Sequence, residues 1–397
     1  MIFFLKNTFS IFFLICLSFK LAIAEIPSTI VFKAGEDGYK VFRIPAIVLA
    51  ANGDLLAFCE ARQGDDANET DLILKRSFDS GRNWGKIEIV QESDDFLSYY
   101  FDKNREITIG NPAPVVDHLN PNYPGRLWLP FTLENDRVFV TYSDDFGKSW
   151  SEKREITDDV KREEWGWYAT GPVHSIQLEQ EPYRGRLIIP SDHSVGDDGI
   201  DGGKYGAHAI LSDDHGKTWR IGALDNEYDD GMRSNETTVV ELNDGSLYFN
   251  TRNQKGEAAG TRGESWSHDG GENFDSRNTK WKNFRPIQGV FDLPVVQGAL
   301  LRAAKNLILF SGPDESGPSG EGRYDIRIRY SNDETKTWHD GPLIYIGPAA
   351  YSDMVLLSDK SVGILFESGS PNQNDAYQHI SFSVIKSEYL KSMKPKK

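Results

Sequence analysis

The sequence contains little cysteine and comparatively little positive charge. Two of its 397 residues are cysteine, and 44 lysines and arginines stand against 60 aspartates and glutamates, for a net charge of −16. This acidic balance argues against nucleic acid or an anionic membrane surface as a partner. It also repels anions at long range, so an anionic substrate would need a local cluster of cations. Cys16 falls in an N-terminal segment that we expect to be removed, which leaves Cys59 alone and excludes an intramolecular disulfide.

Motifs typical of metal and nucleotide sites are also missing from the sequence. It has no two closely spaced cysteines, no HExxH motif and no Walker loop. The histidines in the middle of the chain are scattered, and we interpret them as structural: His174, His193, His208 and His215. We therefore expect no bound metal and no cofactor.

Residues 1–24 have the pattern of a signal peptide. Lys6 gives a positive start, an apolar stretch follows, and residues 22–24 form a small-residue cleavage site. An uncleaved membrane anchor is the alternative, but Lys20 interrupts the apolar run before it reaches spanning length. We expect a secreted or periplasmic protein with one domain over residues 25–397.

One pattern recurs along most of the chain: serine, any residue, aspartate, any residue, glycine, two further residues and an aromatic. Successive copies start 66, 69, 55 and 64 residues apart. Each copy can close a hairpin, because the aspartate accepts hydrogen bonds from turn amides, the glycine takes a positive φ and the aromatic packs beneath the loop. The fourth copy ends in Phe274, and the fifth has Thr335 in place of glycine. The copies span 77–84, 143–150, 212–219, 267–274 and 331–338.

The spacing of the copies suits one four-stranded sheet per copy. Between the turns the sequence alternates as strands do, for example over 73–77 and 326–330, and no segment within the repeats has a long helical period. Small sheets repeated around a centre are the propeller solution to exposed strand edges. We therefore predict an all-β propeller whose repeated aspartates are structural.

These repeats resemble the Asp boxes, or BNR repeats, of the sialidase superfamily, in particular exo-α-sialidases similar to glycoside hydrolase family 33. The resemblance covers residues 28 to about 390 and implies a six-bladed β-propeller of four-stranded antiparallel sheets. Other glycosidases and non-catalytic binding proteins carry the same repeat, so function depends on the residues of the site rather than on the fold.

Three arginines match the positions at which this family binds the carboxylate of sialic acid. Phe42-Arg43-Ile44-Pro45 resembles the family's FRIP motif, Arg252 ends a strand that follows a hairpin, and Arg323 precedes a strand and the last repeat. Arg327 and Arg329 alternate with isoleucines, so we interpret them as lining a strand face. A guanidinium is planar, always charged and forked, which suits a carboxylate better than lysine does. The resemblance implies that Arg43, Arg252 and Arg323 bind a sugar carboxylate.

The resemblance also implies a nucleophile, its partner and a brace for the first arginine. Tyr351, in Ala350-Tyr351-Ser352, is similar to the tyrosine nucleophile of the family, and Glu236 is similar to the glutamate that takes its proton. Glu367 ends a strand 16 residues after Tyr351 and resembles the family glutamate that orients the first arginine. The anomeric carbon of a sialic acid already carries a carboxylate, so a neutral phenol can attack where a second anion would be repelled.

An acidic loop after the first hairpin resembles the family loop that carries the general acid and base. Counting back from the following strand favours Asp66, with Asp65 as the alternative. Arg62 resembles an arginine near the carboxylate and the 4-hydroxyl of the sugar. Two further residues, Asn111 and Gln297, match family segments beside the substrate.

Two tryptophans near Tyr168 could face a sugar or belong to the core. Trp165 and Trp167 lie in one short segment, and aromatic rings both stack on sugars and fill propeller cores. The sequence leaves both interpretations open.

The main hypothesis is a retaining exo-α-sialidase that acts on terminal α-linked sialic acids of glycoproteins, glycolipids or oligosaccharides. The alternatives are a non-catalytic sialoglycan-binding propeller and a glycosidase for a related ulosonic acid. We expect a sialylated glycan as substrate, no nucleic-acid partner, no stable membrane insertion after signal cleavage, and a monomer.

Overall fold

The regular structure of the protein is almost entirely β. The computed structural model describes residues 26–197, 200, 202–254, 260–278, 280–287, 289, 291, 293–315 and 322–393, so the predicted signal segment lies outside the described residues. Within them the helical elements are short, and none is long and apolar enough to cross a membrane. They are η1 (Ser93–Tyr99), α1 (Thr157–Val160) and α2 (Ser387–Ser392).

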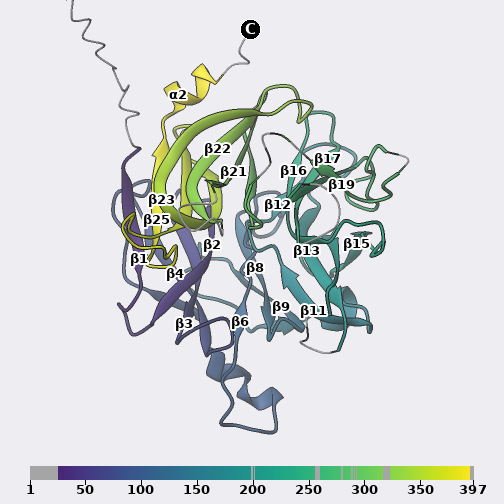
Figure 1. The fold of residues 1–397 in the computed structure, drawn as a ribbon. Coiled ribbons are helices and arrows are strands. Elements are labelled where there is room, and N and C mark those ends of the chain that lie inside the picture. The colour runs from purple at the N-terminus through teal and green to yellow at the C-terminus, as the bar shows by residue number, and fades with distance from the viewer. Residues whose placement is uncertain are drawn as a thin grey trace, which may run out of the picture.

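The strands form antiparallel sheets that follow one another around the molecule in chain order (Figure 1). The first sheet has the order β2 (Val41–Leu49), β3 (Leu55–Arg62), β4 (Thr70–Ser77), β5 (Glu88–Gln91). The second contains β6 (Ile109–Gly110), β7 (Val115–Asp117), β8 (Arg126–Leu133), β9 (Arg137–Ser143) and β10 (Arg154–Glu155). The third contains β11 (Trp165–Thr170), β12 (Ile176–Gln177), β13 (Leu187–Val195), β14 (Lys204–Ser212) and β15 (Arg220–Leu224).

The remaining strands form a four-stranded and a seven-stranded sheet. The fourth sheet has the order β16 (Ser234–Glu241), β17 (Leu247–Asn253), β18 (Arg262–Ser267), β19 (Arg285–Ile287). The fifth contains β1 (Ser28–Lys33), β20 (Ala299–Ala304), β21 (Leu307–Glu315), β22 (Tyr324–Ser331), β23 (His339–Leu356), β24 (Val362–Ser368) and β25 (His379–Ile385).

The prediction of an all-β propeller is confirmed. The number of separate sheets differs, because the described residues form five sheets where six four-stranded sheets were expected. The reason is the length of β23, which has 18 residues. Its first half pairs with β22 and its second half, from Ala349, pairs with β24. Two sets of four strands therefore share β23 and merge into one sheet.

The first and last strands of the ring are neighbours. Strand β1 pairs with β25, with Ser28 opposite Ser383 and Lys33 opposite His379, and the two lie side by side in Figure 1. An antiparallel sheet shared by both ends of the chain leaves fewer unpaired edges. This pairing closes the ring.

The five repeated turns have the predicted geometry. In each one the serine hydroxyl donates to the aspartate and accepts from the amide of the residue at the glycine position, as Ser143 does with Asp145 and Gly147. Thr335 takes the left-handed conformation at φ 65° that glycine takes in the other copies, so the missing glycine leaves the turn intact. The same set of bonds occurs in every copy.

The tryptophans of the repeats also pack against aromatic rings of neighbouring sheets. Trp150 of the second sheet packs edge-on against Phe58 of the first, with ring centroids 6.0 Å apart, and Trp219 packs in the same way against Trp128 of the preceding sheet. Phe274 instead contacts rings of its own sheet. The tryptophans therefore stabilise the contacts between sheets as well as the turns.

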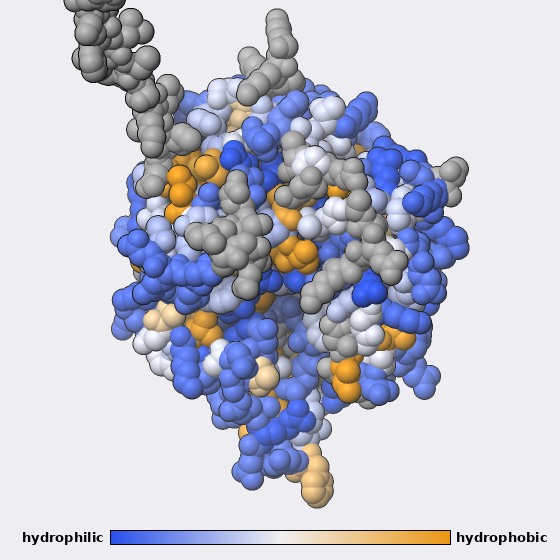
Figure 2. All heavy atoms as spheres, viewed as in Figure 1, coloured by the Kyte–Doolittle hydropathy of each residue, from blue (hydrophilic) through white to orange (hydrophobic). Residues whose placement is uncertain are grey.

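The core lies between neighbouring sheets. Because each sheet is covered on both faces, inner strands such as β3 and β24 are buried at every position instead of alternating. The face shown in Figure 2 is mainly hydrophilic, with hydrophobic residues scattered over it, as on an ordinary protein surface.

Candidate active site

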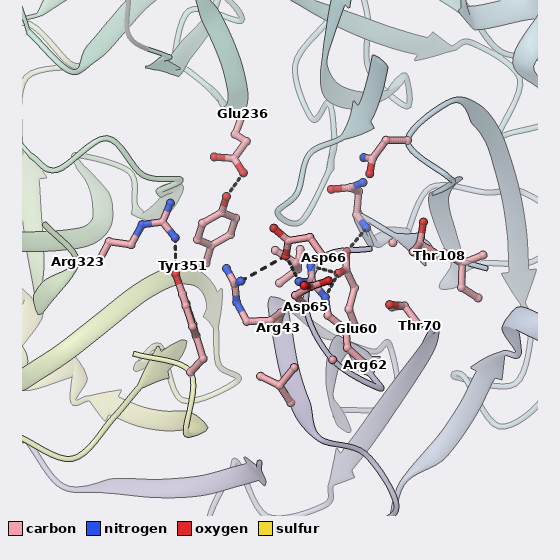
Figure 3. Close-up of a pocket in the computed structure, with 18 of the residues that line it drawn as sticks. Arg43, Glu60, Arg62, Asp65, Asp66, Thr70, Thr108, Glu236, Arg323 and Tyr351 are labelled. Carbon is pink, nitrogen blue, oxygen red and sulfur yellow. Dashed lines mark hydrogen bonds and ion pairs between the residues drawn. The ribbon is translucent and has the colours of Figure 1, made fainter. Parts of the chain in front are cut away.

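A cavity of about 760 Å³ is lined by residues from all five sheets (Figure 3). Three of the strands that reach it have an irregular register at the residue that lines the cavity. Arg43, Glu236 and Tyr351 each lie where a β-bulge interrupts pairing, in β2, β16 and β23 respectively. A bulge turns a side chain away from its regular direction, and such bulges occur next to active sites. Nine residues predicted for the site line the cavity: Arg43, Arg62, Asp65, Asp66, Asn111, Glu236, Arg252, Arg323 and Tyr351.

Tyr351 and Glu236 are in direct contact, although they are 115 residues apart in the sequence. The Tyr351 hydroxyl donates to Glu236 Oε1, and Arg252 Nη1 donates to Glu236 Oε2 at 2.8 Å and to the Tyr351 oxygen at 3.2 Å. Burial and the negative charge of Glu236 raise the pKa of Tyr351 well above its ordinary value. The phenol is therefore held neutral with its proton directed at a carboxylate.

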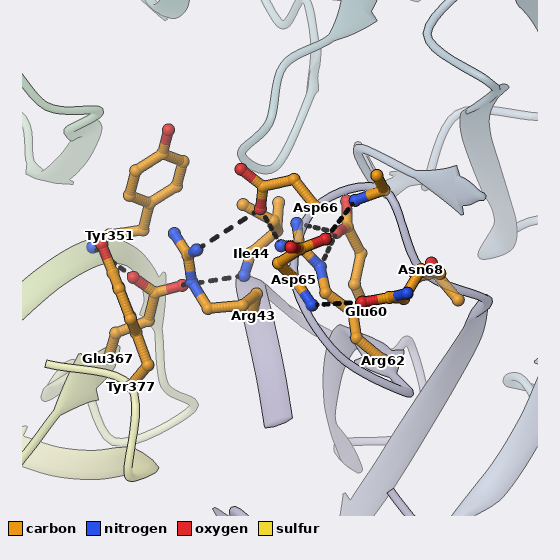
Figure 4. Close-up of polar contacts among 12 residues, drawn as sticks. Arg43, Ile44, Glu60, Arg62, Asp65, Asp66, Asn68, Tyr351, Glu367 and Tyr377 are labelled. Atoms are coloured by element: carbon orange, nitrogen blue, oxygen red, sulfur yellow. Dashed lines mark hydrogen bonds and ion pairs between the residues drawn. The ribbon is translucent and has the colours of Figure 1, made fainter. Parts of the chain in front are cut away.

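Arg43 is fixed from behind by a fully buried carboxylate (Figure 4). Its Nε donates to Glu367 Oε1 at 2.6 Å, and the same oxygen accepts the backbone N–H of Ile44 at 3.0 Å. The other oxygen of Glu367 accepts the backbone N–H of Tyr351 at 3.1 Å. Burial opposes the charge of Arg43, but Glu367 outweighs this effect and raises the pKa of the guanidinium. One carboxylate thus joins the strand of the arginine to the strand of the tyrosine.

Backbone strain accompanies two of the arginines. Ile44, directly after Arg43, has φ 58°, and Arg323 itself has φ 74°. A β-branched residue in this region is a genuine outlier, and strain of this kind gathers at functional sites where the surrounding structure enforces it. Glu367 provides that enforcement at Ile44 by accepting its N–H.

Three arginines surround the ring of Tyr351. Arg252 contacts its hydroxyl, while the Cζ atoms of Arg43 and Arg323 lie 5.4 Å and 5.6 Å from the ring centroid. The structure therefore brings the predicted trio together at one phenol. Arg327 and Arg329 lie elsewhere: both bind Asp314, as expected for residues on a strand face.

Glu60 is a residue of the site that the sequence analysis missed. Its Oε2 accepts from Arg62 Nε at 2.8 Å and from Arg62 Nη2, and its Oε1 accepts the backbone N–H of Asn111 at 2.8 Å. A Cβ at Gly110 would lie 2.3 Å from Glu60 Oε1, so a larger residue there would displace this carboxylate. The signal was present, because Glu60 and Arg62 are two apart on one strand and so share a face.

The acidic loop places its two aspartates differently. Asp66 pairs with Arg62 Nη1, and its carboxylate lies 3.7 Å from Arg43 Nη1. Asp65 instead accepts the backbone N–H of Ala67 at 3.0 Å, which is a local turn contact. Partial desolvation tends to raise the pKa of Asp66, but attraction to Arg62 and Arg43 outweighs it and lowers the pKa. Of the two, Asp66 has the contact with the arginines.

Gln297 does not occupy the expected position at the substrate cavity. It is buried behind the wall, where its Nε2 donates to the carbonyl oxygens of Pro172 and Ser352, and its Oε1 accepts the N–H of Ser352 at 3.0 Å. Gln297 thus holds the strand directly after Tyr351. Asn111 does line the cavity, with its side chain bound to Thr132.

The structure places the two tryptophans differently. Trp167 lines the cavity, whereas Trp165 is fully buried and stacks on His193 at 3.7 Å between ring centroids. His193 and His208 contact each other at 3.1 Å in this cluster. Among the described residues, no three histidine, cysteine, aspartate or glutamate side chains are grouped in a way that could hold a metal ion.

The repeats, the propeller and this site together indicate the family to which the chain belongs. The chain belongs to the BNR repeat-like domain family, whose model matches residues 53–364. Among individual proteins, the chain is similar to a sialidase of Micromonospora viridifaciens, with 28% identity over 361 residues that cover 85% of this chain and 51% of the relative. It is also similar to an exo-alpha-sialidase of Aspergillus fumigatus, with 28% identity over 375 residues that cover 83% of this chain and 79% of the relative.

The comparison with solved structures also finds similarity to a sialidase. The chain is similar to the Hadza microbial sialidase Hz136, with a TM-score of 0.73 and 26% identity over 91% of this chain and 69% of the other. The chain thus spans about half of the Micromonospora relative and more of the others. The resemblance to Asp-box sialidases that the sequence indicates is confirmed.

Proposed function

We propose that the protein is a retaining exo-α-sialidase that hydrolyses terminal α-linked sialic acids of sialylated glycans. The observation that carries the proposal is the contact of a buried tyrosine with a glutamate at the centre of three arginines. The similarity to sialidases supports it. An export signal at residues 1–24 would place the enzyme outside the cytoplasm, where such glycans occur.

The arginines would hold the substrate before any bond breaks. Arg43, Arg252 and Arg323 each use some of their donors on protein partners, and a guanidinium has five N–H donors in a fork that matches a carboxylate. A carboxylate in this cavity faces several cations away from bulk water, where attraction is stronger. This local charge offsets the acidic net charge of the chain.

Tyr351 then attacks the anomeric carbon. The phenol oxygen forms the bond to carbon while its proton passes to Glu236 Oε1, so negative charge develops on the oxygen only as the bond forms. The raised pKa of Tyr351 fits this order, because it prevents a resident phenolate from facing the sugar carboxylate. Water then attacks the anomeric carbon on the face left by the leaving group, the bond from that carbon to the Tyr351 oxygen breaks, and Glu236 returns the proton to this oxygen. The two displacements together give retention.

Asp66 is the proposed acid, and afterwards the base. It donates a proton to the leaving oxygen in the first step and accepts one from water in the second. Without substrate its carboxylate lies against Arg62 and Arg43, which lower its pKa and so disfavour the protonated form. Because the sugar carboxylate would compete for Arg43, substrate binding would weaken one of the two contacts that keep Asp66 ionised, and Asp66 would take its proton from solvent.

The test compares wild type, Tyr351→Phe and Tyr248→Phe on a fluorogenic α-sialoside. We expect wild type to release the α-anomer first, observed by NMR, and Tyr351→Phe to lose at least about a hundredfold in kcat while still binding the sugar. Tyr248 is the matched control, because it is also a buried tyrosine that donates to a glutamate, Glu264, at 3.0 Å and does not line the cavity. Unchanged turnover by Tyr351→Phe would contradict the proposal, and binding without turnover in wild type would favour a sialoglycan-binding propeller.

A further inference from the structure

Tyr377 contacts two of the three arginines, and no step of the proposed reaction uses it. It lies in the loop between β24 and β25 and lines the cavity. The Cζ atom of Arg43 is 3.9 Å from the centroid of its ring, and Arg323 Nη1 donates to its hydroxyl at 2.5 Å. A single side chain therefore connects two guanidinium groups that are 280 residues apart in the sequence.

The position of Tyr377 is well defined by its surroundings. Its backbone N–H donates to Asp375 Oδ1 at 2.8 Å, which fixes the turn before it. The ring packs against a buried cluster formed by Ile44, Val296, Ala350, Tyr351 and Ala376. The loop is also closed at its base, where the N–H of Ser370 donates to Gln378 Oε1 at 2.9 Å. The hydroxyl is thus presented to Arg323 by a ring that is itself held in place.

Arg323 differs from the other arginines of the site in the chemistry of its partner. Arg43 pairs with Glu367, Arg62 with Glu60 and Arg252 with Glu236. Within the described part of the chain, no carboxylate lies within 4 Å of the Arg323 guanidinium. Arg323 Nη1 donates to the neutral hydroxyl of Tyr377, which orients the guanidinium without offsetting its charge.

The same residue acts on Arg43 by a different route. The guanidinium of Arg43 lies over the Tyr377 ring and beside the Tyr351 ring, while Glu367 holds its Nε. A ring face attracts a cation through its quadrupole and carries no net charge. Tyr377 therefore limits the movement of Arg43 without competing for it as an anion.

We infer that Tyr377 is a positioning residue that prepares Arg43 and Arg323 for the carboxylate of the ligand. It orients Arg323 through its hydroxyl and Arg43 through its ring, and it leaves the charge of Arg323 available to the incoming anion. The inference rests on the proposed function, because it assigns a carboxylate to this part of the cavity. Preorganised donors spare the ligand the cost of ordering them.

The experiment uses a pair of ligands that differ only in the charge of interest. The 2,3-unsaturated analogue of N-acetylneuraminic acid and its methyl ester are titrated calorimetrically into wild type, Tyr377→Phe and Tyr345→Phe. Tyr377→Phe retains the ring over Arg43 and removes the hydroxyl from Arg323. We expect its Kd for the acid to rise about fivefold to tenfold, the effect of losing roughly one hydrogen bond, with the Kd for the ester within twofold of wild type.

Tyr345→Phe is the matched control for the shape of the loop. Its hydroxyl donates to the carbonyl oxygen of Gly369, at the start of the same loop, so its removal perturbs the loop at a point away from the hydrogen bond between Tyr377 and Arg323. We expect Kd values like those of wild type. In steady-state kinetics on an α-sialoside, Tyr377→Phe should raise KM severalfold and leave kcat within threefold, because the contact serves bound substrate and transition state alike.

Two results would overturn the inference. Equal weakening of acid and ester would show that Tyr377 shapes the cavity without addressing the carboxylate, and unchanged affinity for the acid would show that its hydroxyl does not position Arg323. The proposed function fails separately, if wild type binds the acid but turns over no α-sialoside. In that case the difference between acid and ester still tests the role of Tyr377.

Discussion

Replacement of Glu367 by glutamine should destabilise the protein, because it removes the carboxylate that pairs with the buried Arg43. The Glu367 side chain is fully buried and accepts three hydrogen bonds, from Arg43 Nε and from the backbone N–H groups of Ile44 and Tyr351. Glutamine has the same shape but one acceptor oxygen, so an NH2 group must face one of these donors. The charge of Arg43, whose side chain is 9% exposed, then has no carboxylate directly behind it.

The magnitude follows from that burial. Removing one partner of a buried ion pair costs about 3–5 kcal/mol, because the other charge stays desolvated. The entropy of unfolding is about 2.1 cal/mol/K per residue. For a chain of 397 residues the total entropy of unfolding is therefore about 0.8 kcal/mol/K. The expected fall in Tm is therefore about 4–6 °C.

Calorimetry of thermal unfolding tests this estimate by comparing Glu367→Gln with a matched control, Glu264→Gln. Glu264→Gln also removes a carboxylate from an arginine, but the Arg285 side chain is 31% exposed and can be hydrated afterwards. We expect the free energy of unfolding to fall by about 1 kcal/mol in Glu264→Gln, or roughly 1 °C in Tm. If Glu367→Gln melts within 1 °C of Glu264→Gln, the burial of the remaining cation does not decide the cost, and the reasoning is wrong.

Three further predictions concern other parts of the molecule. Glu60→Gln should lower kcat/KM on an α-sialoside about tenfold, because Arg62 loses its charged anchor, and steady-state kinetics measures this. Burial lowers the pKa of His193 far below its ordinary value and that of His208 to about 3, so below pH 6.5 the unfolded chain binds protons that the folded chain excludes. Stability should therefore fall as the pH falls, by up to about 2.7 kcal/mol per pH unit for two groups, and His208→Gln should halve that slope in calorimetry at several pH values. Asp145→Ala should cost about 2 kcal/mol of unfolding free energy, because turn amides lose their acceptor, and should leave KM unchanged.

The parts of the fold that depend on local chemistry could be predicted from the sequence. Each repeated turn is closed by contacts within eight residues, as in Ser143–Asp145–Gly147, so the pattern alone indicated its geometry. The propeller followed from the spacing of those turns. The number of separate sheets could not follow, because it depends on how far β23 continues past the point where its pairing changes from β22 to β24.

The candidate site could be predicted from the sequence only in part, because it too depends on contacts between distant strands. Arg43, Glu236 and Tyr351 stand in motifs, but the bulges that direct them into the cavity depend on the partner strands. Tyr377 has no motif, since its role comes from two arginines that are distant in the sequence, Arg43 in β2 and Arg323 just before β22. For Gln297 the motif was misleading. Its sequence segment resembles one beside the substrate, but its side-chain amide is hydrogen-bonded to backbone groups outside the cavity.

The pairing of β1 with β25 determines when the molecule is finished during its synthesis. The strand at Ser28–Lys33 leaves the ribosome early but finds its partner only after His379–Ile385 has been made. Tyr351 and Glu367 lie in the same late sheet. A nascent or prematurely terminated chain that lacks His379–Ile385 therefore leaves β1 without its partner strand and the ring open.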